Sequence, residues 1–208
     1  MIGQRKIRAF FGAGILGAGI WVALLGTLAA TKAVDAAPAT RVLWLNHFEL
    51  QPGKDEVSTS HELTLSCPFQ TCLVGQQIES TTLGDTFADG QAKVVLMAAG
   101  VPPGFDITGV RVCYELSNAA SFITAVRLAQ VNTPPANATV MLDDGSDLTS
   151  PGPVCSDTGQ PPDVFMPFGP VHPENGAVLL SLRVNFGDTA HKIIVRGLAL
   201  LLQKAGGN

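Results

Sequence analysis

Charged residues are scarce in this chain of 208 residues, where Asp, Glu, Lys and Arg together make 14% of the sequence. An average soluble domain carries about 25%. Aromatic residues are equally few at 6%, with two Trp and one Tyr. The formal net charge of −4 leaves no basic surface for nucleic acid, and the 46% of apolar residues excludes a disordered acidic tail. Coiled-coil and collagenous chains are excluded on composition as well.

One long uncharged run, Ala9–Ala30, lies near the N-terminus. Basic residues precede it and small residues follow it before a proline, namely Arg5, Lys6, Arg8, Val34 and Ala36. This pattern predicts an N-terminal export helix that is removed as a signal peptide spanning residues 1–36. An uncleaved anchor is the alternative, because the 22 residues of the run can cross a bilayer. Either way, we expect an exported protein: extracellular, periplasmic or on the cell surface.

The remaining residues, 37–208, form the predicted single domain. Residues 1–36 carry four basic residues and one acidic residue, so their removal changes the net charge from −4 to −7. Such an acidic domain disfavours nucleic acid and anionic membrane surfaces as partners. Its 172 residues suffice for one core.

All four cysteines, Cys67, Cys72, Cys113 and Cys155, lie in this domain. An even number in an exported chain indicates two disulfides, for which three connectivities exist. We favour Cys67–Cys72, which closes a short local loop, and Cys113–Cys155, which ties a strand to a Pro- and Gly-rich loop. The C-x4-C spacing does not match a redox motif. A zinc site is disfavoured because the sequence has no second close pair of Cys or His residues.

Alternation of apolar and polar residues predicts strands throughout the domain. Two hairpins are expected, one joining 110–116 to 122–128 and one joining 178–186 to 193–202. With about eight strands, prolines between them and few charges, the sequence predicts an all-β fold, an antiparallel β-sandwich of jelly-roll type. An immunoglobulin-type sandwich is less favoured because Trp44, the only Trp after residue 36, precedes every cysteine.

Aromatic platforms that stack on sugars are typically Trp or Tyr. Here Trp44 and Tyr114 both lie on alternating apolar faces, Trp44 together with Val42 and Phe48. We therefore expect both rings in the core, which disfavours a sugar-binding module of the aromatic-platform kind.

Catalytic motifs are missing from the sequence. The four His are far apart, and neither an H-x-H pair, a G-x-S-x-G elbow nor an S-x-x-K motif occurs. We expect ordinary surface or turn positions for the His residues, with His47 half-buried.

Carboxylates form one cluster, Asp143, Asp144 and Asp147, around a glycine. Closely spaced carboxylates of this kind are typical of a Ca²⁺ site, to which the loop at Asp157 would add ligands if the 113–155 disulfide brought it near. An Asp-Gly turn kept soluble by its charge is the alternative.

These features favour a non-catalytic module for binding or assembly, possible partners being a glycan or a protein at the cell surface, with Ca²⁺ as the one candidate cofactor. A secreted hydrolase that cleaves glycans through loop carboxylates is the alternative. The apolar strand 193–202 suggests either an inner strand of the sandwich or a homo-oligomer contact.

Overall fold

The computed structural model describes residues 40–67, 70–132, 137–158 and 175–205, without the side chains of 64–73 and 132. The predicted export segment therefore lies outside the described residues. Within the described part, no helix is long and apolar enough to cross a membrane.

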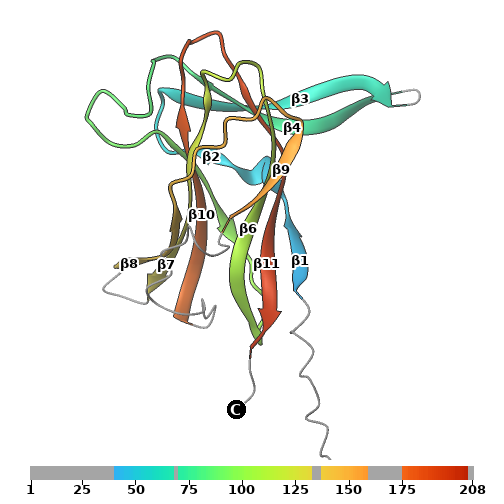
Figure 1. Cartoon of the computed structure of the whole chain (residues 1–208), viewed down its shortest axis with the longest axis vertical. Helices are drawn as coiled ribbons and strands as arrows, with labels where there is room; N and C mark the ends of the chain where they lie inside the picture. The colour runs from blue at the N-terminus through green and yellow to red at the C-terminus, as the bar shows by residue number, and fades with distance from the viewer. Residues whose placement is uncertain (1–39, 68–69, 133–136, 159–174, 206–208) are drawn as a thin grey trace, which may run out of the picture. The chain divides into compact units, whose positions relative to one another are not determined.

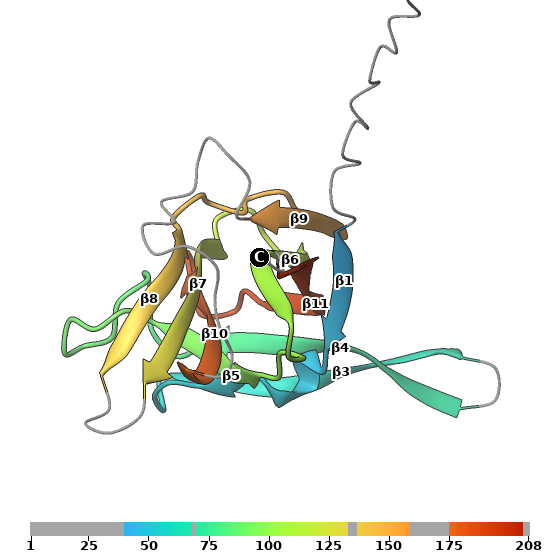
Figure 2. The same ribbon diagram turned by 90° about the horizontal axis from the view of Figure 1, so that it is seen from below.

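Eleven strands within the described residues form two antiparallel sheets that face each other (Figures 1 and 2). The first sheet has the order β3 (Val57–Cys67), β4 (Gln70–Ser80), β11 (Ile193–Lys204), β6 (Phe105–Leu116) and β9 (Val154–Thr158), and β1 (Arg41–Leu45) also pairs with β11. The second has the order β2 (Gln51–Pro52), β5 (Val94–Ala99), β10 (Gly176–Asn185), β7 (Phe122–Asn132) and β8 (Ala138–Asp144). One short 3-10 helix, η1 (His47–Glu49), follows β1. The all-β sandwich predicted from the sequence is confirmed.

The chain folds back on itself between β7 and β8. As a result β7 pairs with β8, β6 with β9, β5 with β10 and β4 with β11, each antiparallel. Successive pairs alternate between the two sheets. Each sheet therefore combines strands that are distant in sequence.

Both predicted hairpins are wrong in their pairing. β6 and β7 lie in different sheets, and so do β10 and β11. The alternation correctly indicated that each strand buries one face, but two strands facing each other across the core show the same alternation as two paired strands. The connecting segments instead bond to each other: Ser117 and Lys192 are joined through the Ser117 N–H to the Lys192 carbonyl at 3.0 Å and the Lys192 N–H to the Ser117 hydroxyl at 2.8 Å.

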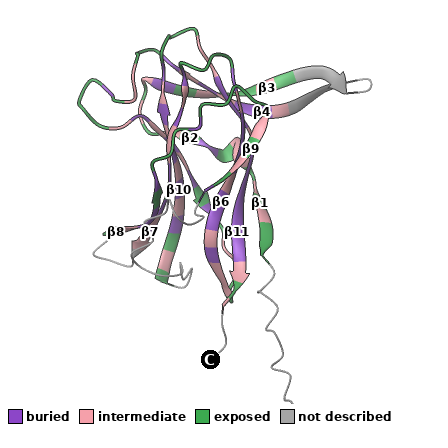
Figure 3. Cartoon of the chain, in the orientation of Figure 1, coloured by how far each residue is buried: buried purple, intermediate pink, exposed green. Residues whose placement is uncertain are grey.

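The core lies between the sheets, and β11 crosses its middle as an inner strand (Figure 3). The residues of β11 that belong to the core are Ile193, Val195, Leu198, Leu200 and Leu202. Uninterrupted alternation along β11 would place Gly197, Ala199 and Leu201 on the same side as Ile193. A register shift between Val195 and Gly197 reverses the alternation, because a bulge adds one residue to the strand. The outer face of the first sheet therefore receives Ala199 and Leu201.

Candidate functional site

Trp44 lies on the outside of the sandwich, and the prediction of a core position is wrong. Trp44 is 57% exposed and Val42 is 41% exposed, whereas Leu43 and Leu45 pack against the core. Phe48 does not continue this strand, because it belongs to η1. Both faces of β1 are apolar in sequence, so only the register with β11, which pairs Trp44 with Ala199, decides which face is buried. Tyr114, at 2% exposed, is buried as predicted.

The indole ring of Trp44 rests on a glycine of the neighbouring strand. A Cβ built on Gly197 would lie 3.0 Å from Cζ3 and 3.6 Å from Cε3 of Trp44. Glycine in a strand interior commonly marks a place where another group approaches closely. The ring is thus supported from the sheet side and is accessible from the solvent side.

Beside this ring, one cross-strand row joins four strands on the outer face. Trp44 pairs with Ala199, Ala199 with Arg111, and Arg111 with Asp157. The intervening Ala199 is small and fully buried. With strands about 4.8 Å apart, the row places Arg111 roughly 10 Å from β1 across the face. An aromatic surface and a polar pair therefore lie next to each other.

Arg111 and Asp157 form a bidentate ion pair at the end of this row. The Arg111 Nε and Nη2 groups donate to the two Asp157 carboxylate oxygens at 2.6 and 2.8 Å. This bonding lowers the pKa of Asp157 below its usual range and raises the pKa of Arg111. Both groups consequently stay charged at neutral pH and hold a fixed geometry.

The adjacent row contains the disulfide Cys113–Cys155, which confirms the predicted pairing. Cys113 pairs with Gly197 on one side and with Cys155 of β9 on the other. The bond therefore links the short edge strand β9 to β6 directly beside the Trp44 ring. The predicted Cys67–Cys72 pair lies outside the described side chains.

A second charged group lies on the same outer face. Arg196 donates to Glu115 of β6, with Nη2 at 2.5 Å, and reaches Glu62 of β3 across the intervening strand β4. Gly75 lies opposite Glu62, and a Cβ there would be only 2.7 Å from Cγ2 of Ile194, so a glycine allows β4 and β11 to approach closely beside this contact. The outer face thus carries two Arg and three carboxylates in fixed pairs around one exposed Trp.

The carboxylates predicted to bind Ca²⁺ are engaged separately. Asp143 accepts two hydrogen bonds from Arg127, at 3.0 and 2.7 Å, and Asp144 is 6% exposed and accepts the Ser146 N–H at 2.9 Å. Asp147 is exposed. In the part of the chain that the structure describes, no three His, Cys, Asp or Glu are grouped as metal ligands. Ca²⁺ binding at these residues stays a prediction.

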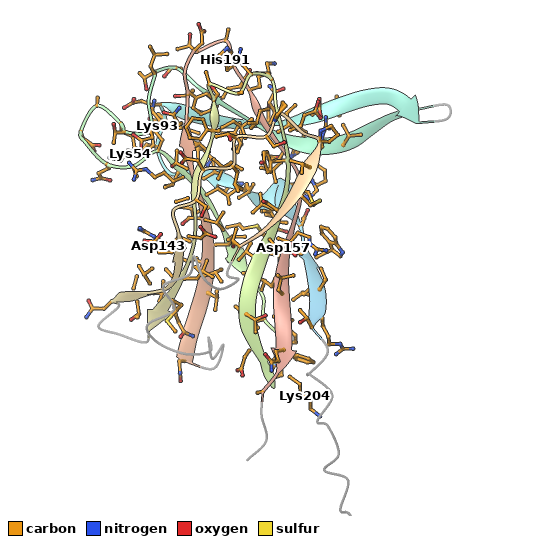
Figure 4. All side chains as sticks on the ribbon, in the orientation of Figure 1. Lys54, Lys93, Asp143, Asp157, His191 and Lys204 are labelled. Atoms are coloured by element: carbon orange, nitrogen blue, oxygen red, sulfur yellow. A yellow bond between two sulfur atoms is a disulfide. The ribbon has the colours of Figure 1, made fainter. Side chains whose placement is uncertain are left out.

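Asp157 lies in strand β9 and not in the predicted loop, and it does not approach this cluster. Figure 4 shows Asp157 with the first sheet and Asp143 with the second, and their pairing strands are β6 and β7 respectively. The disulfide ties Cys155 to the first sheet, so it holds Asp157 away from Asp143.

Sequence comparisons identify no relative: no family model and no curated protein matches the chain. Among solved structures, the CBM22-1–GH10 modules of an endo-1,4-β-D-xylanase from Clostridium thermocellum, complexed with xylohexaose, align at TM-score 0.45 and 8% identity over 80% of this chain and 28% of that one. The enzymatically active domain of tailspike protein 4 from bacteriophage CBA120 aligns at TM-score 0.36 and 12% identity over 78% of this chain and 19% of that one. The chain thus spans less than a third of either structure.

Proposed function

We propose that the protein is an exported, non-catalytic saccharide-binding module that binds neutral glycans on the outer face of the first sheet. The observation that carries this proposal is Trp44, which is 57% exposed and whose ring is supported by Gly197. The C–H face of a sugar ring stacks on such an indole surface, and burial of both apolar faces favours the complex. Export places the module where cell-surface and extracellular glycans occur.

The polar groups beside Trp44 suit sugar hydroxyls. Arg111 offers N–H donors and Asp157 offers carboxylate oxygens, and a pair of neighbouring hydroxyls can bond to both. These groups neutralise each other, while Arg196 faces two carboxylates. An acidic ligand would therefore meet a face with one excess negative charge, and a neutral saccharide is favoured.

Binding is favoured over glycan cleavage by the ionisation of the carboxyl groups. A glycosidase requires a general acid whose pKa is raised, so that it is protonated at working pH. At this face the pKa of Asp157 is shifted in the opposite direction by Arg111. Hydrolysis remains the alternative, and release of reducing sugars from a bound oligosaccharide would support it.

The fold supporting this face is assigned to the jelly-roll class as part of the proposal. Its support is the chain path, in which a long antiparallel ribbon from β4 to β11 is rolled so that its four strand pairs alternate between sheets. Strands β1 and β3 extend the first sheet. Trp44 and Glu62 thus both lie on these additional strands, Trp44 on β1 and Glu62 on β3.

Calorimetric titration with neutral hexasaccharides (cellohexaose, xylohexaose, mannohexaose) tests the proposal. Trp44→Ala is expected to weaken binding about tenfold or more, since tenfold corresponds to about 1.4 kcal/mol, the scale of one lost aromatic contact. Val42→Ala, at the exposed neighbouring position, serves as the matched control and is expected to change affinity less than threefold. Equal affinities for Trp44→Ala and the unaltered protein would refute the assignment.

A further inference from the structure

A cleft of about 410 Å³ lies on the outer face of the second sheet, away from Trp44. This volume falls in the range of small-molecule sites, roughly 300–1,000 Å³. Its polar lining consists of Asp85, Thr124, Arg127, Asp143, Ser181 and Arg183. The remaining lining is small, from two alanines, one glycine and one valine. Aromatic side chains do not line this cleft within the described residues.

Two ion pairs form the charged part of the cleft. Arg127 binds Asp143 with two hydrogen bonds, and Arg183 Nη2 lies 2.5 Å from Asp85 Oδ2. The pairs belong to adjacent positions of the sheet, because Ser181 is opposite Arg127 and Arg183 is opposite Ala125. The cleft therefore has no net charge but presents both donors and acceptors.

Two hydrogen-bonding atoms of the residues that line the cleft have no partner within the described residues. Thr124 Oγ1 and Arg183 Nε are buried and have no hydrogen-bond partner in the described part of the chain. Thr124 is the extra residue of a bulge, since Ile123 and Ala125 pair with consecutive residues of β10. Bulges commonly redirect a side chain next to a binding site. Neither atom is exposed to solvent, so the polar groups that a ligand in the cleft can reach are the two ion pairs and Ser181.

We infer that this cleft is a second saccharide site, which takes a neutral, hydroxyl-rich sugar unit. This inference rests on the proposed function, because it assigns the same ligand class to a second face. An anionic ligand would meet the carboxylates of Asp85 and Asp143, and a cationic ligand would meet the two Arg. Sugar hydroxyls donate and accept, and so fit both members of each pair as well as Ser181.

Two sites on opposite sheets make the module bivalent. The cleft is on the sheet of Asp143 and the Trp44 face is on the sheet of Asp157, and Figure 4 shows these labelled residues on the two sheets. One chain of the protein can then hold two glycan chains, one on each face. Such a module cross-links polysaccharides and binds multivalent surfaces more tightly than either site alone.

Stoichiometry measured by calorimetry with the best-binding neutral hexasaccharide tests the inference. Ala125→Phe fills the cleft, and Ala98→Phe on the same sheet, at an exposed alanine outside the lining, is the matched control. Two sugars per chain are expected for the unaltered protein and for Ala98→Phe, one each for Trp44→Ala and Ala125→Phe, and none for the double variant. Hexagalacturonate is expected to bind at least tenfold more weakly.

The outcomes separate the two assignments. One sugar per chain that is lost only with Trp44→Ala would refute the cleft site and leave the proposed function intact. Binding lost only with Ala125→Phe would refute the Trp44 face while retaining the cleft. Tighter binding of hexagalacturonate would refute the neutral ligand class, and absence of saccharide binding would refute both sites.

Discussion

The indole ring of Trp44 lies against Gly197, so closely that a Cβ on this glycine would be 3.0 Å from Cζ3. The tilt of the ring therefore depends on the absence of a side chain at residue 197. Glycine at this position has an ordinary backbone conformation, and an alanine could be accommodated if the ring moved.

Gly197→Ala is expected to weaken saccharide binding about three- to tenfold, because the added methyl group lifts the ring and displaces the stacking surface. Calorimetric titration measures the change, with thermal unfolding as a check that the fold persists. Gly100→Ala is the control, since a Cβ there meets nothing within 4 Å. An unchanged affinity for Gly197→Ala would show that ring support from the sheet is unimportant.

Lys93 is fully buried, and its ammonium group donates to the carbonyls of Thr82, Leu83 and Gly84 at 2.6, 2.8 and 3.2 Å. Burial lowers the pKa of Lys93, an effect that nearby Glu56 and Asp85 oppose. Lys93→Met would leave these carbonyls without their donor. We expect a loss of about 2 kcal/mol or more in the free energy of unfolding, measured by urea denaturation.

Lys54→Met is the comparison for Lys93→Met, because Lys54 pairs with Asp89 at the exposed surface. An exposed pair contributes about 0–1 kcal/mol. Equal losses for the two variants would contradict the role assigned to the Lys93 contacts.

Burial of His47 makes the stability of the sandwich depend on pH. Its Nε2 atom is buried without a hydrogen-bond partner in the described residues, its ring packs 4.2 Å from that of Phe48, and burial lowers its pKa from 6.5. The unfolded chain therefore binds a proton more readily than the folded one as pH falls below 6.5. Stability associated with neutral His47 is complete above that pH and is lost as pH falls through the folded-state pKa.

His47→Phe keeps the ring packing and removes the titration. The melting temperature of the variant is expected to fall less between pH 7.5 and pH 5 than that of the unaltered protein, when both are measured by differential scanning calorimetry. Parallel curves for the two proteins would contradict this assignment.

Much of the fold could be predicted because burial leaves a clear trace in alternating residues. Val110, Val112 and Tyr114 alternate with Arg111 and Cys113 in the sequence, and all three lie in the core. Pairing could not be derived in the same way, since strands in facing sheets alternate like paired strands. The bulge after Val195 also left no mark in the apolar pattern, because the residues on both sides of β11 are mostly aliphatic.

The exposed position of Trp44 could not be predicted, because both faces of β1 are apolar. Val42 and Trp44 are as apolar as Leu43 and Leu45, so the exposed set could not be distinguished from the buried set. One signal was present in Gly197, an isolated glycine in an apolar strand, which indicates close approach of another group. Only the Asp143 cluster gave a local signal near the cleft, because the rest of the lining comes from β5, β7, β10 and the segment before β5.

Fluorescence of Trp44 tests the central claim most directly. The chain contains only two tryptophans, so Trp21→Phe leaves Trp44 as the sole indole reporter. Titration of this variant with the binding hexasaccharide is expected to shift Trp44 emission to shorter wavelength, because the stacked sugar excludes water from the ring, with a midpoint equal to the calorimetric Kd. Calorimetric binding at full stoichiometry without any change in Trp44 emission would contradict the account.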